Sequence, residues 1–187
     1  MHNETKRQAV HILLFGLAFV LKFLSVFQSL LILIFLLVLV LFIFPRLKIR
    51  SHFYRHFEKQ YRNGAVTYFL VLLTLILIFP LKVVAVSWGI LALGDGMATL
   101  IGRNFKTRKL PWNLTKSYAG SLAFVVFGAL GAGVVLKWFD PILVTSQLVS
   151  VSFKTAVVAA IAESLPLKID DNITVAVVSA VVVNFLI

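Results

Sequence analysis

The chain has 187 residues, of which 60% are hydrophobic, and its mean hydropathy is +1.01. One soluble core of this length cannot bury that much apolar surface, so the composition predicts an integral membrane protein. The absence of cysteine excludes disulfides, thiolate catalysis and cysteine-ligated zinc. The net charge of +11 indicates basic loops that face an anionic membrane surface, rather than a nucleic-acid partner.

Apolar runs divide the chain into about seven predicted membrane-spanning helices, and six is the alternative because several runs fall short of the roughly 20 residues that a span needs. The runs comprise residues 9–24, 29–44, 65–79, 81–101, 118–139, 151–165 and 173–187. No clean signal-peptide cleavage site follows the first run, so we expect it to be retained. The predicted fold is therefore an all-α polytopic bundle that forms a single integral membrane domain over residues 1–187.

The segment 45–63 carries six basic residues and one acid, Glu58. Its aromatic residues recur every fourth position, which predicts an amphipathic helix at the cytoplasmic membrane surface. These aromatics are Phe53, Phe57 and Tyr61. His52 and His56 also share a helical face, but no third ligand lies nearby in the sequence, so we expect a solvated pair facing lipid headgroups rather than a metal site.

A carboxylate and a basic loop stand together after the fourth apolar run. Asp95 lies between two glycines near the end of that run, where a charge costs roughly 2.5–3.5 kcal/mol at the bilayer centre. The loop at residues 102–117 carries five cations and no acid: Arg103, Lys106, Arg108, Lys109 and Lys116. These cations are expected either to pair with Asp95 or to form the anion-binding half of a site that also holds a metal.

The distribution of lysine and arginine predicts the orientation in the membrane. With the N-terminus in the cytoplasm and seven spans, most of the 18 basic residues fall on the cytoplasmic side. Those on the other side or at helix ends are Lys22, Lys82, Lys137 and Lys154. The same topology brings Asp95, Glu163, Asp170 and Asp171 to the cytoplasmic face, and it leaves the N-x-T sequons at Asn3, Asn113 and Asn172 unglycosylated.

Carboxylates on one membrane face can hold Mg²⁺, which bridges phosphate oxygens while lysine and arginine neutralise the remaining charge. One carboxylate can also accept a proton from an attacking hydroxyl. This combination favours phosphoryl or nucleotidyl transfer from a cytosolic nucleotide to a membrane-dissolved substrate. Neither GxxxxGK[ST] nor GxGxxG occurs in the chain, so the nucleotide motifs of soluble proteins give no support.

Each of these residues also has a structural interpretation. Asp95 is equally suited to an ion pair with Arg103 or Lys116, and Glu163 to ending its helix. Residues 170–172 suit the N-cap of the last helix, because Asp and Asn favour that position. The basic loop by itself is a topology signal. The coincidence of all these features on one face favours the functional interpretation.

Two blocks of the sequence resemble a known family. LGDGMATLIGRNFKTRKLPWNLTKSYAGSLAF from Leu93 and AESLPLKIDDNITV from Ala162 resemble the membrane-bound prenol kinases, a family that includes phytol kinases, dolichol kinases and CTP-dependent diacylglycerol kinases. KRQAVHI, at residues 6–12, resembles the short basic segment with a histidine that precedes the family's first helix. The resemblance implies transfer of the γ-phosphate of CTP to a membrane isoprenoid alcohol, such as phytol or a polyprenol like dolichol.

The resemblance also implies the site residues. It assigns catalysis to Asp95, Glu163 and Lys116. It assigns nucleotide and phosphate binding to Arg103, Lys109, Lys116, Ser117 and Asn172. It assigns Mg²⁺ to Asp95, Asp170 and Asp171. Gly96 and Met97 stand where many relatives have small residues, which is a mild departure from the family pattern.

The chain lacks the long N-terminal extension of eukaryotic dolichol kinases, so a phytol kinase-like or prokaryotic branch and a prokaryotic plasma membrane are expected. Two other functions stay open. A CTP:phosphatidate cytidylyltransferase also joins CTP, Mg²⁺ and lipid at a cytoplasmic face. A proton-coupled transporter would use Asp95 and Glu163 nearer the middle of the membrane. The glycines of the fifth run permit close helix packing within the chain or in an oligomer.

Overall fold

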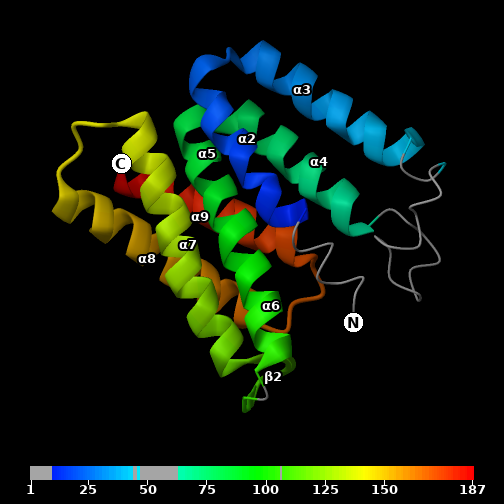
Figure 1. Ribbon diagram of the computed structural model, residues 1–187, viewed down its shortest axis with the longest axis vertical. Helices are drawn as coiled ribbons and strands as arrows, with labels where there is room; N and C mark the ends of the chain where they lie inside the picture. Colours follow the sequence, from blue (N-terminus) through cyan, green and yellow to red (C-terminus); the bar gives the residue numbers. More distant parts are fainter. Residues whose placement is uncertain (1–9, 44–45, 47–62, 106) are drawn as a thin grey trace.

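The computed structural model of the protein describes residues 10–43, 46, 63–105 and 107–187, and these residues are mostly helical (Figure 1). The helices are α2 (Phe15–Val20), the 3-10 turn η1 (Leu21–Phe23), α3 (Val26–Val38), the π-helical η2 (Leu39–Ile43), α4 (Asn63–Ile78), α5 (Leu81–Gly89), the π-helical η5 (Ile90–Asp95), α6 (Gly96–Asn104), α7 (Tyr118–Phe139), α8 (Thr145–Ser164) and α9 (Asp171–Leu186). Two short strands, β1 (Lys109–Leu110) and β2 (Asn113–Ser117), pair antiparallel.

The helices begin where the local sequence satisfies their first backbone amides. Ser25 and Gln28 form a capping box at the start of α3. The Ser117 hydroxyl accepts the amide hydrogen of Gly120 at the start of α7, and the Asp170 carboxylate does the same for Asn172 at the start of α9. Pro80 is the N-cap of α5, and its carbonyl oxygen accepts the amide hydrogen of Val84 at 3.1 Å.

Every predicted apolar run corresponds to a helix in the described residues. Within the described ranges, four helical segments are long and apolar enough to cross a membrane: Val26–Ile43, Leu81–Asn104, Tyr118–Phe139 and Thr145–Ser164. Three shorter apolar helices accompany them: Val10–Phe23, Gly64–Ile78 and Asp171–Leu186. The prediction of a helical membrane protein is therefore confirmed.

Two predicted boundaries are wrong. α8 begins at Thr145 rather than at residue 151, because hydropathy marks only the apolar part of a helix whose first turns are partly polar and exposed. The fourth helical segment extends to Asn104, so Asp95 lies within it and not near its end. Residues 102–117 also differ from the expected loop, because part of this stretch is the β1–β2 hairpin. The all-α description is therefore too simple in that place.

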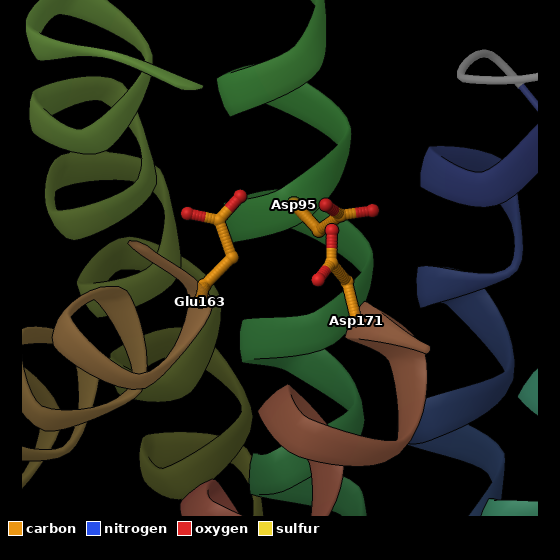
Figure 2. A group of neighbouring side chains, drawn as sticks. All are labelled: Asp95, Glu163 and Asp171. Atoms are coloured by element: carbon orange, nitrogen blue, oxygen red, sulfur yellow. The ribbon is translucent and has the colours of Figure 1, made fainter. Parts of the chain in front are cut away.

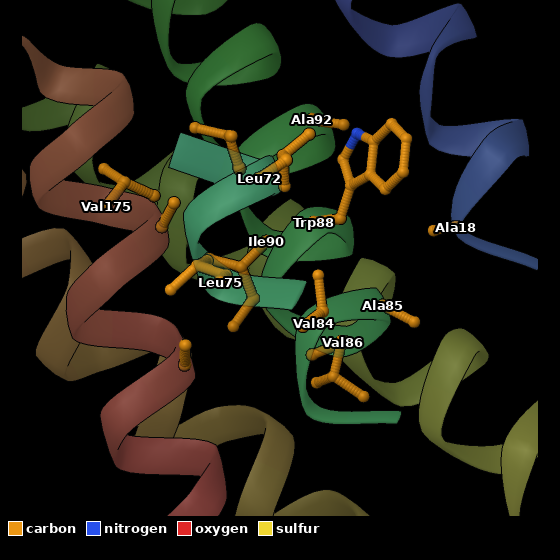
Figure 3. Close-up of a cluster of buried hydrophobic side chains, with 14 of the residues drawn as sticks. Ala18, Leu72, Leu75, Val84, Ala85, Val86, Trp88, Ile90, Ala92 and Val175 are labelled. Atoms are coloured by element: carbon orange, nitrogen blue, oxygen red, sulfur yellow. The ribbon is translucent and has the colours of Figure 1, made fainter. Parts of the chain in front are cut away.

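The segment formed by α5 and η5 lies in the middle of the bundle (Figure 1). All ten residues from Val83 to Ala92 are buried, and a helix that is apolar on all sides must be covered on all sides. α2, α4, α7 and α9 supply that cover. Figure 3 shows the resulting core, in which Trp88 and Ile90 lie among side chains such as Leu72, Leu75 and Val175. The core thus fixes the helix that carries Asp95.

α5 and α7 approach each other through two glycines. A Cβ added to Gly131 would lie 2.6 Å from the carbonyl oxygen of Gly89, and one added to Gly89 would lie 2.9 Å from that of Gly131. Both distances are shorter than any real Cβ contact, so no larger residue fits without a shift. The prediction that the glycines of residues 118–139 allow close helix packing is confirmed within the chain.

Three of the cations assigned to the non-cytoplasmic side lie at the end of the bundle where α5 begins. The Lys22 ammonium donates to the Trp138 carbonyl at 2.6 Å and lies 5.1 Å from the centre of its ring. Lys82 pairs with Asp140 at 3.4 Å, and Lys137 donates to the Leu143 carbonyl at 3.1 Å. From Lys82 to Asp95 the helix rises by about 20 Å. Asp95 and these cations are therefore well separated along the bundle.

Several predictions concern residues outside the described part of the chain. The amphipathic helix at 45–63 falls there except for its residues 46 and 63. His52, His56, Asn3, Lys106 and the segment KRQA at residues 6–9 also fall there.

Candidate functional site

Three carboxylates from separate parts of the chain meet at one point. Asp95 ends η5, Glu163 is the next-to-last residue of α8, and Asp171 is the first residue of α9. Each offers a carboxylate oxygen, and these oxygens all lie within 4.8 Å of one another. Figure 2 shows the three side chains converging from their helices. The prediction that acids far apart in the sequence gather at one place holds for these three.

Lys116 joins this group from strand β2. Its ammonium donates to a carboxylate oxygen of Glu163 and, at 2.8 Å, to Oδ2 of Asp171. The Glu163 side chain is only 3% exposed, whereas that of Asp171 is 48% exposed. One cation therefore bridges a buried acid and an acid that is open to solvent.

The helix dipoles explain why Glu163 needs this cation more than Asp171 does. Asp171 lies in the first turn of α9, where the partial positive charge of the helix N-terminus stabilises an anion. Glu163 lies at the C-terminus of α8, where the dipole opposes a negative charge. Burial disfavours the charged form of Lys116, but the carboxylates of Glu163 and Asp171 outweigh burial, so the pKa of Lys116 is raised above its ordinary value. Lys116 consequently stays charged at neutral pH.

The β1–β2 hairpin holds Lys116 in place through the end of α8. Trp112 donates its indole N–H to the Ser164 hydroxyl at 3.3 Å, and the Asn113 amide donates to the Ser164 carbonyl at 3.1 Å. Ser164 directly follows Glu163, so the hairpin is attached next to the residue with which Lys116 pairs. Neither Trp112 nor Asn113 is among the site residues predicted from the sequence.

The glycines of the first resembling block bring α6 against α7. A Cβ on Gly102 would lie 3.0 Å from the Ser117 hydroxyl oxygen and 3.4 Å from the Gly120 Cα. Ser117 is itself buried and caps α7 through Gly120. The described contacts of Ser117 are thus structural, and they fix the position from which the preceding residue, Lys116, reaches the carboxylates.

The other predicted site residues differ in their contacts and exposure. Asp170 caps α9 and is not among the three clustered acids, and the Asn172 amide donates to the Gly64 carbonyl at 3.1 Å. Arg103 lies exposed in the last turn of α6, and Lys109 lies exposed in β1. Lys116 is the predicted cation whose ion pairs with the clustered acids are described above, with Glu163 and with Asp171.

The three carboxylates suit a hard divalent cation by their chemistry. Mg²⁺ binds oxygen ligands and is usually held by one or two carboxylates together with water and substrate phosphates. When all four groups are ionised, one ammonium leaves three carboxylates with excess negative charge, so a cation would be stabilised here. The residues therefore fit the expected ion.

His11 is a further neighbour that the sequence does not single out as a site residue. Its Nε2 atom lies 3.8 Å from Oδ2 of Asp95 and 3.0 Å from the carbonyl oxygen of Leu91. The only sequence signal was its place in the basic segment at residues 6–12, which by itself assigns no role.

Comparison with curated proteins identifies related plant sequences. The chain is 37% identical over 95 residues to a chloroplastic farnesol kinase of Arabidopsis thaliana, and the aligned region covers 48% of this chain and 31% of that protein. It is 34% identical over 134 residues to a probable chloroplastic phytol kinase 1 of Glycine max, covering 66% and 43%, respectively. It is 31% identical over 128 residues to a probable chloroplastic phytol kinase of Triticum aestivum, covering 63% and 42%.

The chain thus spans less than half the length of these relatives. Their names place them in chloroplasts, which gives no support to the expected prokaryotic plasma membrane. No family model and no solved structure matches the chain. By sequence, this chain is related to the phytol and farnesol kinases, and the predicted resemblance to the prenol kinase family is confirmed.

Proposed function

We propose that this chain is a membrane-bound lipid-alcohol kinase that transfers the γ-phosphate of CTP to the hydroxyl group of an isoprenoid alcohol such as phytol. The observation that carries the proposal is the meeting of Asp95, Glu163 and Asp171 with Lys116, within a chain related to proteins named phytol and farnesol kinase. Carboxylates and a fixed cation are the groups that phosphoryl transfer requires.

In this proposal, acids and cations divide the work at the nucleotide. Asp95 and Asp171 would hold Mg²⁺, and the family resemblance assigns Asp170 to the same task. Mg²⁺ would neutralise charge on the phosphate oxygens. Lys116, which pairs with Glu163 and Asp171, would stabilise charge on the transferred phosphate. The family resemblance assigns Arg103, Lys109, Ser117 and Asn172 to the rest of the nucleotide, although the Ser117 hydroxyl is buried and caps α7.

The chemical step is a displacement at phosphorus. The alcohol oxygen attacks the γ-phosphorus, the bond between that phosphorus and the β,γ-bridging oxygen breaks, and the nucleoside diphosphate leaves. A carboxylate, Asp95 or Glu163, accepts the proton of the hydroxyl group. The products are a prenyl monophosphate and CDP.

We further propose seven spans, with the N-terminal end of this chain and the site facing the cytoplasm. Lys22, Lys82 and Lys137 lie at the end of the bundle distant from Asp95, which is the non-cytoplasmic end in this orientation. Most of the other lysine and arginine residues then fall on the cytoplasmic side, as the positive-inside rule requires, and this supports the proposed orientation. The lipid alcohol would reach the site from the bilayer, while the nucleotide would reach it from the cytoplasm.

The competing functions predict different products. A cytidylyltransferase would release pyrophosphate from CTP and phosphatidate, whereas a kinase releases CDP. A transporter would require neither nucleotide nor Mg²⁺. Asp95 lies deeper in its helix than the sequence predicts, as a transporter would require, but its neighbours Glu163 and Asp171 lie at helix ends.

The test is a comparison of donors and products with purified protein in detergent. CTP, ATP, GTP and UTP are each supplied with Mg²⁺ and phytol, and the nucleotide products are separated by chromatography. We expect CDP to form from CTP in step with phytyl monophosphate. Pyrophosphate release in the presence of phosphatidate, with no CDP and no phosphorylated alcohol, would overturn the kinase proposal and support a cytidylyltransferase.

A further inference from the structure

His11 forms a hydrogen bond to the backbone of the helix that carries Asp95. Its Nε2 atom lies 3.0 Å from the Leu91 carbonyl oxygen. A carbonyl oxygen has no hydrogen to give, so Nε2 must carry the hydrogen and donate it. The same atom lies 3.8 Å from Oδ2 of Asp95, so a partially positive N–H group also faces that carboxylate.

The bond reaches the helix where its winding changes. Leu91 and Asp95 both belong to the π-helical η5, a wider form of helix that is rare and is frequent at functional sites. The amide of the next residue, Gly96, donates to the carbonyl of Leu93, so the helix tightens immediately after Asp95. The direction in which Asp95 leaves the helix therefore depends on how this wide turn is held.

The imidazole ring of His11 is held from behind by buried aromatic residues. Its centre lies 4.7 Å from that of the Tyr68 ring, edge to face. The Tyr68 hydroxyl in turn accepts the indole N–H of Trp88 at 2.5 Å. Tyr68 and Trp88 are 3% and 1% exposed, so this support is part of the core and is fixed by close packing.

We infer that His11 is a positioning residue: by binding the Leu91 carbonyl it fixes the π-helical turn, and it thereby directs Asp95 toward Glu163 and Asp171. Tyr68 and Trp88 fix the orientation of the His11 imidazole, and the imidazole holds the π-helical turn through the Leu91 carbonyl. The turn then determines the direction of the Asp95 carboxylate. The kinetic part of this inference rests on the proposed function, whereas the structural part concerns only the geometry of the three acids.

The test uses two variants of His11 and one matched control. His11→Ala removes the donor, while His11→Gln retains an N–H donor on a flexible side chain. Leu13→Ala changes the same helix at a side chain that is 76% exposed. Mn²⁺ binding to each purified protein is measured by electron paramagnetic resonance without nucleotide, and the Mg²⁺ dependence of phytol phosphorylation is measured separately.

We expect His11→Ala to weaken Mn²⁺ binding and to raise the Mg²⁺ concentration for half-maximal rate, each roughly tenfold, as loss of a residue that orients a ligand does. His11→Gln should recover part of both effects, and Leu13→Ala should match the wild type. The KM for phytol should not change. A purely structural role for His11 would lower the amount of folded protein without shifting either metal constant.

The outcomes separate the inference from the proposed function. Graded Mn²⁺ affinity in the order wild type, His11→Gln, His11→Ala, without phosphorylation of any lipid, would support the positioning role and overturn the kinase. Equal metal constants in all four proteins, no advantage of His11→Gln over His11→Ala, or no Mn²⁺ binding by the wild type would each overturn the positioning role.

Discussion

Lys116 and Glu163, which are 47 residues apart in the sequence, form an ion pair in which the carboxylate is almost completely buried. The pair joins the β1–β2 hairpin to the end of α8. Because Glu163 lies at the unfavourable end of its helix dipole, Lys116 is the group that makes a charged side chain tolerable there. The stability of the bundle and the chemistry of the site therefore depend on the same contact.

Removing the Lys116 ammonium should destabilise the folded protein, because the buried Glu163 carboxylate then has lost its paired cation. Lys116→Met leaves the buried acid without its cation, and the loss of one partner of a buried pair costs about 3 kcal/mol. The double variant Lys116→Met/Glu163→Gln removes the charge as well and should recover much of that loss. Thermal unfolding in detergent measures both. If the double variant is no more stable than Lys116→Met, burial of an unpaired Glu163 charge is not the cause.

The same pair predicts how stability depends on pH. The carboxylates raise the pKa of Lys116 in the folded state above its ordinary value of 10.5. The stabilisation is therefore complete below about pH 10.5 and is lost as the pH rises from there through the folded-state pKa. We expect wild type to unfold at a higher temperature than Lys116→Met up to about pH 10, and we expect this difference to shrink above about pH 10.5. A difference that already shrinks between about pH 7 and 9 would contradict the raised pKa.

The contact between α5 and α7 predicts a pair of glycine substitutions with opposite outcomes. Gly131→Ala places a methyl group 2.6 Å from the Gly89 carbonyl oxygen, and overpacking of this kind costs about 1–3 kcal/mol. Gly16→Ala in α2 meets no atom within 4 Å and should be neutral or slightly stabilising. Unfolding temperatures in one detergent compare the two. Equal stability of the variants would show that the helices are not packed through these glycines.

The attachment of the hairpin predicts a loss of activity without a loss of fold. Asn113→Ala removes the hydrogen bond to the Ser164 carbonyl, which is worth about 1 kcal/mol, and frees the strand that positions Lys116. We expect the rate of prenol phosphorylation to fall about fivefold or more. Leu114→Ala, at a side chain that is 74% exposed in the same strand, is the control. An equal rate in both variants would mean that the hairpin does not position Lys116.

Hydropathy predicts the helices better than it predicts their ends or the site. The limits of α7 follow from Ser117 and from Asp140, and both are visible in the sequence. The π-helical turn at Asp95 and the β1–β2 hairpin depend on contacts between distant residues, such as His11 with Leu91 and Asn113 with Ser164, which no local pattern reports.

The residues of the site also divide into those that the sequence predicts and those whose positions depend on the three-dimensional structure. Charge counting and family resemblance predicted that Asp95, Glu163 and Asp171 share a face. The separate position of Asp170 as a helix cap follows from local chemistry, since a residue placed before the first helical turn can bind the amide of Asn172. Which of two adjacent aspartates points at the other acids is decided by the start of α9, and the sequence alone does not distinguish them.

The central claim is that these acids serve phosphoryl transfer to a prenol, and label transfer tests it most directly. Purified protein in detergent is supplied with Mg²⁺, γ-labelled CTP and, in parallel, phytol, farnesol, a longer polyprenol and diacylglycerol, and the lipids are separated by thin-layer chromatography. We predict that label enters a prenol and that Asp95→Asn and Asp171→Asn each reduce the rate at least about a hundredfold while the proteins remain folded. Wild-type protein that labels no prenol, or Asp95→Asn and Asp171→Asn variants that label it at the wild-type rate, would contradict the account.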